Sequence, residues 1–228
     1  MHVTRLMRLI QFADSFLPVG SFSFSNGIET AIQYGVINDI KTLKDFTYTT
    51  LLQNARCDCR AIIASCIAIK KKNYNVLINY DLAVFNRKIN EENRTMIVRM
   101  GKKFIEMAVQ IIEEPLFVWW LDLIKKGQTV GTYPITQSII MSILDINMRE
   151  IIVMYQYGIA IMMLSAALRL MRITHISIQK ILYEMSNHID KFCHEAEQGS
   201  IENMNNYAPL TDILASFHVN AFTRLFSN

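Results

Sequence analysis

Glycine and proline are scarce in this chain, and their scarcity limits the folds that it can adopt. The 228 residues include 8 glycines and 4 prolines, about 5% of the chain against roughly 12% in average proteins. An all-β sandwich or barrel needs a turn about every 8–12 residues, and the turn formers here are too few to supply them. Neither of the glycine-rich nucleotide-binding patterns, G-x-G-x-x-G or G-x-x-x-x-G-K-[ST], occurs. We therefore predict an all-α fold of roughly eight to ten helices.

Length, charge and cysteine content narrow the class of protein further. A chain of this length buries roughly 70–75% of its unfolded surface, and no linker divides it, so we expect a single domain over residues 1–228. The 23 basic and 20 acidic residues give a formal net charge of +3, and no basic stripe suggests a nucleic-acid partner. The four cysteines form no C-x-x-C pair, and the N-terminal residues do not resemble a secretory signal. We expect reduced thiols and a cytoplasmic protein.

One segment raises the question of a membrane span. Residues 151–168 carry no charged side chain, and about 18 such residues are the lower limit for a transmembrane helix. The segment also contains tyrosine, glutamine, glycine and serine, and Glu150 and Arg169 flank it. A buried core helix is the favoured interpretation, and we expect no membrane contact. Such a helix must be covered nearly all round, by other helices or by a second subunit.

Periodicity and capping residues indicate where the helices lie. Thr42, with Asp45 three residues later, is typical of a helix start, and Asn147 with Glu150 resembles a capping box. The segment 14–27 is predicted to be a structured loop, and residues 199–206 a polar, mobile one; residues 75–90 give a mixed signal. The predicted helices cover residues 1–13, a segment from 28, a segment from 42, 58–71, a segment from 90, 115–126, 134–143, 148–172, 176–197 and part of 209–228.

No constellation of residues indicates catalysis or a self-contained metal site. On a helix the thiols of Cys57 and Cys59 would point about 200° apart, and two histidines six residues apart do not converge either. The acid, hydroxyl and imidazole of Asp212, Ser216 and His218 are close in sequence, but a triad is defined by geometry. His2 is the one weak metal candidate, because a twofold dimer could bring two copies together.

Three segments resemble the UreF family of urease accessory proteins. The first is LIQFADSFLPVGSFSFSNGIE over residues 9–29, and the second is SAALRL over residues 165–170. The third comprises APLTD at 208–212, then His218, then RLFS at 224–227. Their order and spacing also fit, so the resemblance covers nearly the whole chain.

Three positions depart from the family pattern. Ser21 stands where the family has a second glycine after the proline, and Val219 stands where a glutamate usually follows the C-terminal histidine. Thr174-His175 replaces a frequent Gly-Gln pair. These departures put individual contacts in question, not the resemblance.

The resemblance implies a chaperone for nickel insertion that is not an enzyme. UreF proteins are all-helical and form homodimers, and they bind a second accessory protein, UreD (also called UreH). The pair recruits and regulates the GTPase UreG during assembly of the nickel metallocentre of apo-urease. No stably bound cofactor is expected, and nickel would be present only in transit. The alternative is a helical enzyme whose site converges only in three dimensions.

The same resemblance suggests which residues contact partners. Residues 200–228 would form a partner-docking arm that becomes ordered on binding, in which Arg224 makes charge-assisted bonds and Leu225 and Phe226 fill a pocket; the alternative is that a terminal helix packs on its own core. Ser25 and Glu29 would cap the next helix or face a partner, and Arg169 would join a buried ion pair or extend to solvent. The motif residues expected to shape the loop or bind partners are Pro18, Gly20, Ser25, Gly27, Glu29, Arg169, Pro209, Asp212, His218, Arg224, Leu225 and Phe226.

Overall fold

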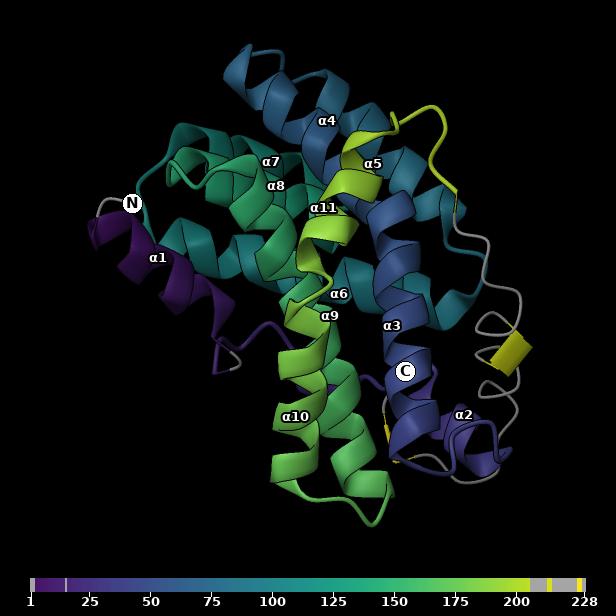
Figure 1. Ribbon diagram of the computed structural model, residues 1–228. Coiled ribbons are helices and arrows are strands. Elements are labelled where there is room, and N and C mark those ends of the chain that lie inside the picture. Colours follow the sequence, from purple (N-terminus) through teal and green to yellow (C-terminus); the bar gives the residue numbers. More distant parts are fainter. Residues whose placement is uncertain (1–2, 15, 206–212, 215–224, 227–228) are drawn as a thin grey trace.

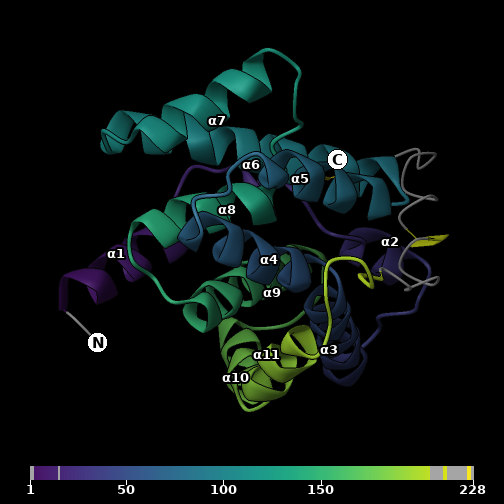
Figure 2. The same ribbon diagram turned by 90° about the horizontal axis from the view of Figure 1, so that it is seen from above.

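The fold is built from α-helices, as the sequence predicts. The structure is a computed structural model that describes residues 3–14, 16–205, 213–214 and 225–226, and these residues contain no β-strand. Two views at right angles show the helices gathered around α9 (Figures 1 and 2). The elements are α1 (Val3–Ala13), the 3-10 turn η1 (Ser21–Ser23), α2 (Ile28–Gln33), α3 (Ile40–Arg56), α4 (Asp58–Lys70), α5 (Val76–Arg87), α6 (Glu91–Ile111), α7 (Pro115–Lys125), α8 (Tyr133–Ile143), α9 (Met148–Leu170), α10 (His175–Ser186) and α11 (Ile189–Glu197).

Helix α9 is the central helix of the fold. The predicted capping box is present: the Asn147 side chain accepts from the Glu150 backbone N–H, and the Glu150 carboxylate accepts from the Asn147 N–H. Within the described residues α9 is the one helix long and apolar enough to span a membrane, but 67% of its apolar window is buried inside the protein. Helices α1, α2, α3, α4, α8, α10 and α11 pack against it. This covering is what a core helix with almost no polar face requires.

A second layer lies on one side of α9, where α8 packs between α4 and α6 (Figure 2). Gly101 brings the backbone of α6 against the start of α8: a Cβ atom at this glycine would lie 2.0 Å from the Gly131 carbonyl oxygen. The buried Asp81 carboxylate accepts hydrogen bonds from the backbone N–H groups of residues 130–132, at 2.7–3.0 Å, and from two threonine hydroxyls. One side chain of α5 thus fixes the loop that leads into α8.

Several predicted boundaries differ from the observed ones. Helix α3 begins at Ile40 with Asp39 as its N-cap, and Thr42 is the third residue of the helix, where its hydroxyl completes a capping box. The Asp39 carboxylate accepts from the Thr42 N–H at 2.7 Å. The mixed signal of residues 75–90 is resolved as helix α5.

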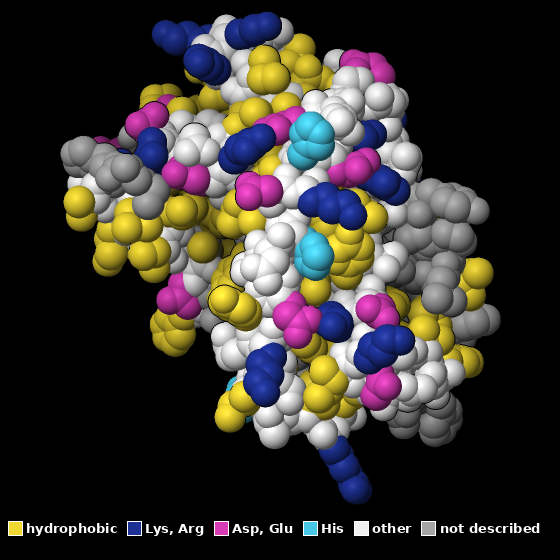
Figure 3. Space-filling model, viewed as in Figure 1, with side chains coloured by type: hydrophobic (Ala, Val, Ile, Leu, Met, Phe, Trp, Pro, Cys, Tyr) yellow, Lys and Arg dark blue, Asp and Glu magenta, His cyan; other side chains and the backbone are white. Residues whose placement is uncertain are grey.

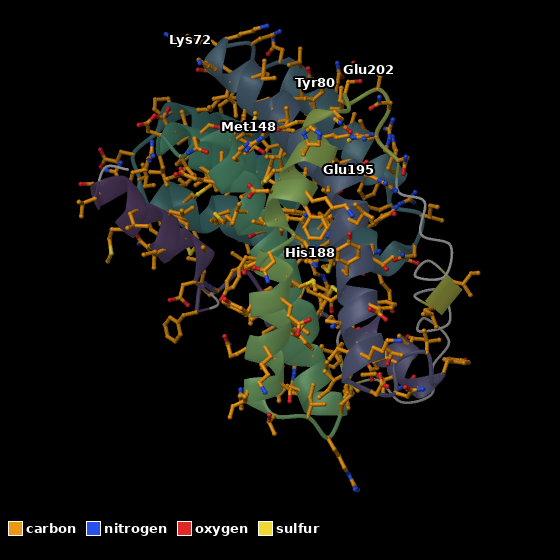
Figure 4. The ribbon with its side chains drawn as sticks, in the orientation of Figure 1. Lys72, Tyr80, Met148, His188, Glu195 and Glu202 are labelled. Atoms are coloured by element: carbon orange, nitrogen blue, oxygen red, sulfur yellow. The ribbon has the colours of Figure 1, made fainter. Side chains whose placement is uncertain are left out.

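The predicted single helix over residues 176–197 is wrong, because it is broken into α10 and α11 at Asn187–His188. The Asn187 and His188 N–H groups bond to carbonyls three residues earlier, a tighter turn than that of an α-helix. The His188 ring contacts Tyr48 of α3 edge-to-face, with 5.1 Å between the ring centroids (Figure 4). Helix α10 packs on α9 and α3, and α11 packs on α3, α4 and α9, so the break lets one apolar stripe reach an additional neighbour, α4.

Candidate functional site

The N-terminal loop that carries the first motif has a defined backbone shape. Gly20 (φ 82°) and Gly27 (φ 84°) both adopt the left-handed region, where a residue without a Cβ atom is strongly favoured. Gly20 precedes the η1 turn and Gly27 is the N-cap of α2. Pro18 lies between the end of α1 and Gly20. Ser21, where the family has glycine, is not among the described residues with positive φ, so this departure introduces no backbone strain.

Arg169, in the last turn of α9, contacts the N-terminal loop and the C-terminal segment at the same time. Its guanidinium lies 4.0 Å from the ring centroid of Phe22 and 4.1 Å from that of Phe226. It also donates a hydrogen bond of 3.0 Å to the Phe22 carbonyl oxygen. Partial burial between these groups lowers the pKa of Arg169 from its ordinary value. Of the two expectations for Arg169, the ion pair is not found among the described residues. The residue is exposed, as the second expectation had it, and its guanidinium stacks on two aromatic rings.

Glu29 links the start of α2 to the same C-terminal segment. Its carboxylate, only 1% exposed, accepts a hydrogen bond of 2.9 Å from the backbone N–H of Leu225. A carboxylate in the first turn also interacts favourably with the helix dipole. Ser25 does not cap α2 with its side chain, because Gly27 is the N-cap residue. The Ser25 hydroxyl is buried and has no hydrogen-bond partner in the described part of the chain.

We call Phe22, Glu29, Arg169, Leu225 and Phe226 the terminal cluster. The two C-terminal members have opposite exposures, since Phe226 is 3% exposed against Arg169 while Leu225 is 76% exposed. Phe22 is also largely exposed, at 68%. Residues from the three sequence motifs thus meet on one surface, and part of that surface packs on its own core while part of it faces outward.

Residues 199–205, where the sequence predicted a mobile loop and where the C-terminal arm begins, make specific contacts with α4 and α5. Arg60 of α4 donates to the Asn203 carbonyl at 2.8 Å, and Arg87 of α5 donates to the Met204 carbonyl at 2.9 Å. Gly199 lies directly against the Arg60 guanidinium, where a Cβ atom would come within 2.1 Å of it. Tyr80 of α5 lies beside this segment, and Glu202, which belongs to it, lies above Glu195 of α11 in the view of Figure 4.

Five of the predicted site residues lie outside the described part of the chain. They are His2, Pro209, Asp212, His218 and Arg224, and the same holds for the departure at Val219. The remaining departure, Thr174-His175, is described: the Thr174 hydroxyl caps α10 by accepting from the Ser177 N–H at 3.1 Å. Although Thr174-His175 differs from the family pattern, Thr174 therefore serves as the N-cap of α10.

Sequence reasoning missed the two arginines that hold residues 199–205 and the Asp81 contact. Arg60 is the one charged residue inside the apolar run CRAIIASCIAI of α4, and a lone charge in such a run is a signal of a buried polar contact. Phe22 belongs to the N-terminal motif, but its pairing with Arg169 joins residues 147 positions apart. No local pattern contains such a contact.

The chemistry available to the described residues is limited. They contain no group of three or more His, Cys, Asp or Glu side chains that could hold a metal ion. Burial raises the pKa of the Cys57 thiol to about 12 and that of Cys66 to about 11. Since the thiolate is the nucleophile and the metal ligand, these cysteines are inert at neutral pH.

The fold and the terminal cluster define an all-helical protein in which described residues from three sequence motifs pack together. Comparison with known proteins identifies the family. The UreF family profile matches residues 37–186. The chain is 56% identical to the urease accessory protein UreF of Photorhabdus laumondii, 51% to that of Yersinia enterocolitica and 50% to that of Yersinia pseudotuberculosis, each over 228 residues and 100% of both chains.

The chain belongs to the UreF family of urease accessory proteins. Its relatives are named as accessory proteins and not as enzymes, so the alternative of a helical enzyme is set aside.

Proposed function

We propose that the chain serves the maturation of the urease nickel centre by binding UreD (UreH), and that the pair then recruits and regulates the GTPase UreG. Family membership supports this role. The observation that carries it for this chain is the convergence of the N-terminal loop, Arg169 and the C-terminal pair in the terminal cluster. These are the segments in which the family motifs lie.

The terminal cluster has the composition of a protein-binding surface. Leu225 and Phe22 present apolar side chains to solvent beside the Arg169 guanidinium. Aromatic and arginine side chains are enriched among the residues that contribute most to protein–protein affinity. Glu29 holds the Leu225 backbone from the buried side, and a contact residue that is held before a partner arrives costs less entropy on binding.

Helix α1 supplies a second apolar surface. Its buried face is fixed by Phe12, whose ring lies 6.0 Å from that of Phe104, while Val3, Met7 and Ile10 are exposed on its other side. Figure 3 shows apolar side chains gathered over this helix. Contiguous exposed apolar side chains of this kind mark interaction surfaces. In this proposal α1 and the terminal cluster are covered by UreD or by the second copy in a homodimer.

The chemistry of maturation is divided among the proteins of the complex. The sequence has no P-loop pattern, so the GTPase supplies nucleotide binding and hydrolysis. Nickel is cargo in this scheme, delivered to apo-urease in the cytoplasm, and no cofactor is held stably by this chain. His2 stays the one candidate for transient nickel contact.

A single exposed side chain tests the proposal. Leu225→Ala removes the outward apolar group of the terminal cluster, and Ile176→Ala is the matched control because Ile176 on α10 is 69% exposed. Each full-length variant is titrated with purified UreD, and UreG is then added. We expect Leu225→Ala to weaken UreD binding roughly tenfold, about 1.4 kcal/mol, a larger loss than most interface residues show on truncation, and Ile176→Ala to bind like the wild type.

Two results would count against the proposal. Wild-type protein that binds neither UreD nor, in its presence, UreG would refute the function itself. Wild-type binding that Leu225→Ala and Ile176→Ala weaken equally would leave the function standing but remove the terminal cluster as its contact surface.

A further inference from the structure

The first residues of the C-terminal arm are attached to the core at two neighbouring places (Figure 1). One is the junction of α3 and α4: Arg60 donates to a carbonyl of this segment, and the backbone N–H of Asn205 donates a hydrogen bond of 3.3 Å to the Arg56 carbonyl oxygen. The other is the end of α5, where Arg87 donates to a second carbonyl. The position of the first arm residues therefore depends on how these two places are held relative to each other.

A buried ion pair joins the same two places. Lys88, the residue after Arg87, donates from Nζ to Oδ2 of Asp58 at 2.7 Å, and the two side chains are 6% and 1% exposed. Asp58 lies two residues before Arg60. The Tyr155 hydroxyl of α9 donates to the same carboxylate oxygen. Burial, together with the negative charge of Asp58, raises the pKa of Tyr155 well above its ordinary value, so this hydroxyl stays a donor at neutral pH.

The ion pair lacks the full set of hydrogen bonds that a strongly stabilising pair needs. Burying two charges costs desolvation energy, which their attraction repays only when the remaining polar atoms are also satisfied. Asp58 Oδ1 is buried and has no nitrogen or oxygen donor in the described part of the chain. Apolar side chains of similar size often replace such a pair without loss of stability. They do not replace its geometry, because hydrogen bonds are directional and apolar contacts are not.

We propose that Lys88 is a positioning residue for partner docking: with Asp58 and Tyr155 it fixes the α3–α4 junction against the end of α5 and so sets where the C-terminal arm begins. This inference rests on the proposed function, in which the arm contacts UreD. Because Lys88 is buried, it acts through the arginines beside the pair and not by touching UreD. Arm residues that are held in place beforehand cost less entropy on binding.

An apolar replacement of the cluster separates positioning from stability. The triple variant Asp58→Leu/Lys88→Met/Tyr155→Phe exchanges the ion pair and the hydroxyl for apolar groups of similar size. The full-length protein is compared with the wild type by urea denaturation, by amide hydrogen exchange of residues 200–205 in the free chain, and by its affinity for UreD. The exchange measurement needs no partner, so it tests the positioning step separately from the proposed function.

We expect the triple variant to unfold at the urea concentration of the wild type or above it. Hydrogen exchange in residues 200–205 should nevertheless be roughly tenfold faster, and UreD should bind roughly tenfold more weakly, because these residues must then be ordered on binding. Lys44→Met/Glu184→Gln is the matched control: it removes another Lys–carboxylate pair between helices, 2.8 Å long and joining α3 to α10. It should leave both the exchange of residues 200–205 and the UreD affinity as in the wild type.

Three results would overturn the proposal: wild-type exchange of residues 200–205 in the triple variant, faster exchange there with wild-type affinity for UreD, or faster exchange throughout the chain with a lower urea midpoint. Tyr155→Phe, which removes only the hydroxyl, provides the test where the triple variant does not fold. It should speed exchange in residues 200–205 roughly threefold, and unchanged exchange would again overturn the proposal. A wild-type chain that does not bind UreD would refute the proposed function instead, and the exchange rates of the free chain would still show whether the ion pair holds the segment.

Discussion

Two glycine-to-alanine substitutions in helix interiors should change stability in opposite directions. By helix propensity alone, either substitution should raise the free energy of unfolding of the protein by up to about 1 kcal/mol. Gly158 lies in α9, and a Cβ atom there would meet no atom within 4 Å. Gly101 lies in α6, and a Cβ atom there would lie 2.0 Å from the Gly131 carbonyl oxygen and 2.7 Å from the Tyr133 nitrogen. These neighbours are backbone atoms, which cannot move aside by changing a rotamer.

The size of the effect at Gly101 follows from this geometry. Ordinary carbon–oxygen contacts lie beyond about 3 Å, so α6 and α8 would have to separate by more than about 1 Å. Overpacking of a close-packed core typically costs about 1–3 kcal/mol, occasionally more, and the opposing propensity gain is about 1 kcal/mol. A 2.0 Å approach to backbone atoms places the overpacking cost near the top of that range, about 3 kcal/mol. We therefore expect Gly101→Ala to lower the free energy of unfolding by about 2 kcal/mol, and Gly158→Ala to raise it by about 0.5 kcal/mol.

Urea denaturation followed by circular dichroism measures both variants against the wild type. A Gly101→Ala protein as stable as the wild type would refute the close approach of α6 and α8. A Gly158→Ala protein that is destabilised as strongly as Gly101→Ala would show that the free space around the added Cβ atom does not decide whether the substitution stabilises the protein.

Three further predictions address the loop before α8, the buried thiols and the start of the C-terminal arm. Asp81→Asn should lower the free energy of unfolding by about 3 kcal/mol in urea titrations, because an amide cannot accept all the bonds from residues 129–132; an unchanged midpoint would contradict this role. Burial raises the pKa of Cys57 from 9.0 to about 12. As the pH rises, the Cys57 thiol therefore loses its proton in the unfolded state before it does so in the folded state. The thiol's contribution to stability is therefore complete below pH 9 and is lost as the pH rises toward 12. Between pH 9 and 11 the wild type should lose about 2 kcal/mol more than Cys57→Ala, and parallel pH profiles would refute this. Gly199→Ala should displace Arg60 and speed hydrogen exchange in residues 200–205; wild-type protection there would show that the Arg60 contact is not needed.

The sequence predicted the helices that have strong local signals. The Asn147–Glu150 capping box and the start of the helix predicted over residues 115–126 are both confirmed, because each depends on residues within one helical turn. The break between α10 and α11 was not predicted. It is stabilised by the contact of His188 with Tyr48, a residue 140 positions away. The apolar stripe continues across the break, so periodicity alone could not show it.

The sequence indicated which residues belong to the candidate site, but not which of these residues contact one another. The family resemblance indicated Glu29, Arg169, Leu225 and Phe226, and the structure brings these four together. Arg169 was expected to pair with an acid or extend to solvent; it is exposed, but its stacking on aromatic rings from both terminal segments was not predicted. Whether a cation finds a carboxylate or a ring depends on tertiary neighbours, and a single sequence does not specify them.

The most direct test of the account asks whether the two terminal segments act as one binding unit. A double-mutant cycle on Phe22→Ala and Phe226→Ala, read out as the affinity for UreD, measures this coupling. Both rings stack on Arg169, and residues that share a partner typically couple by about 0.5–3 kcal/mol. The account predicts that each single variant weakens UreD binding and that the double variant loses clearly less than the sum. Losses that add exactly as for independent sites, or variants that all bind UreD like the wild type, would contradict it.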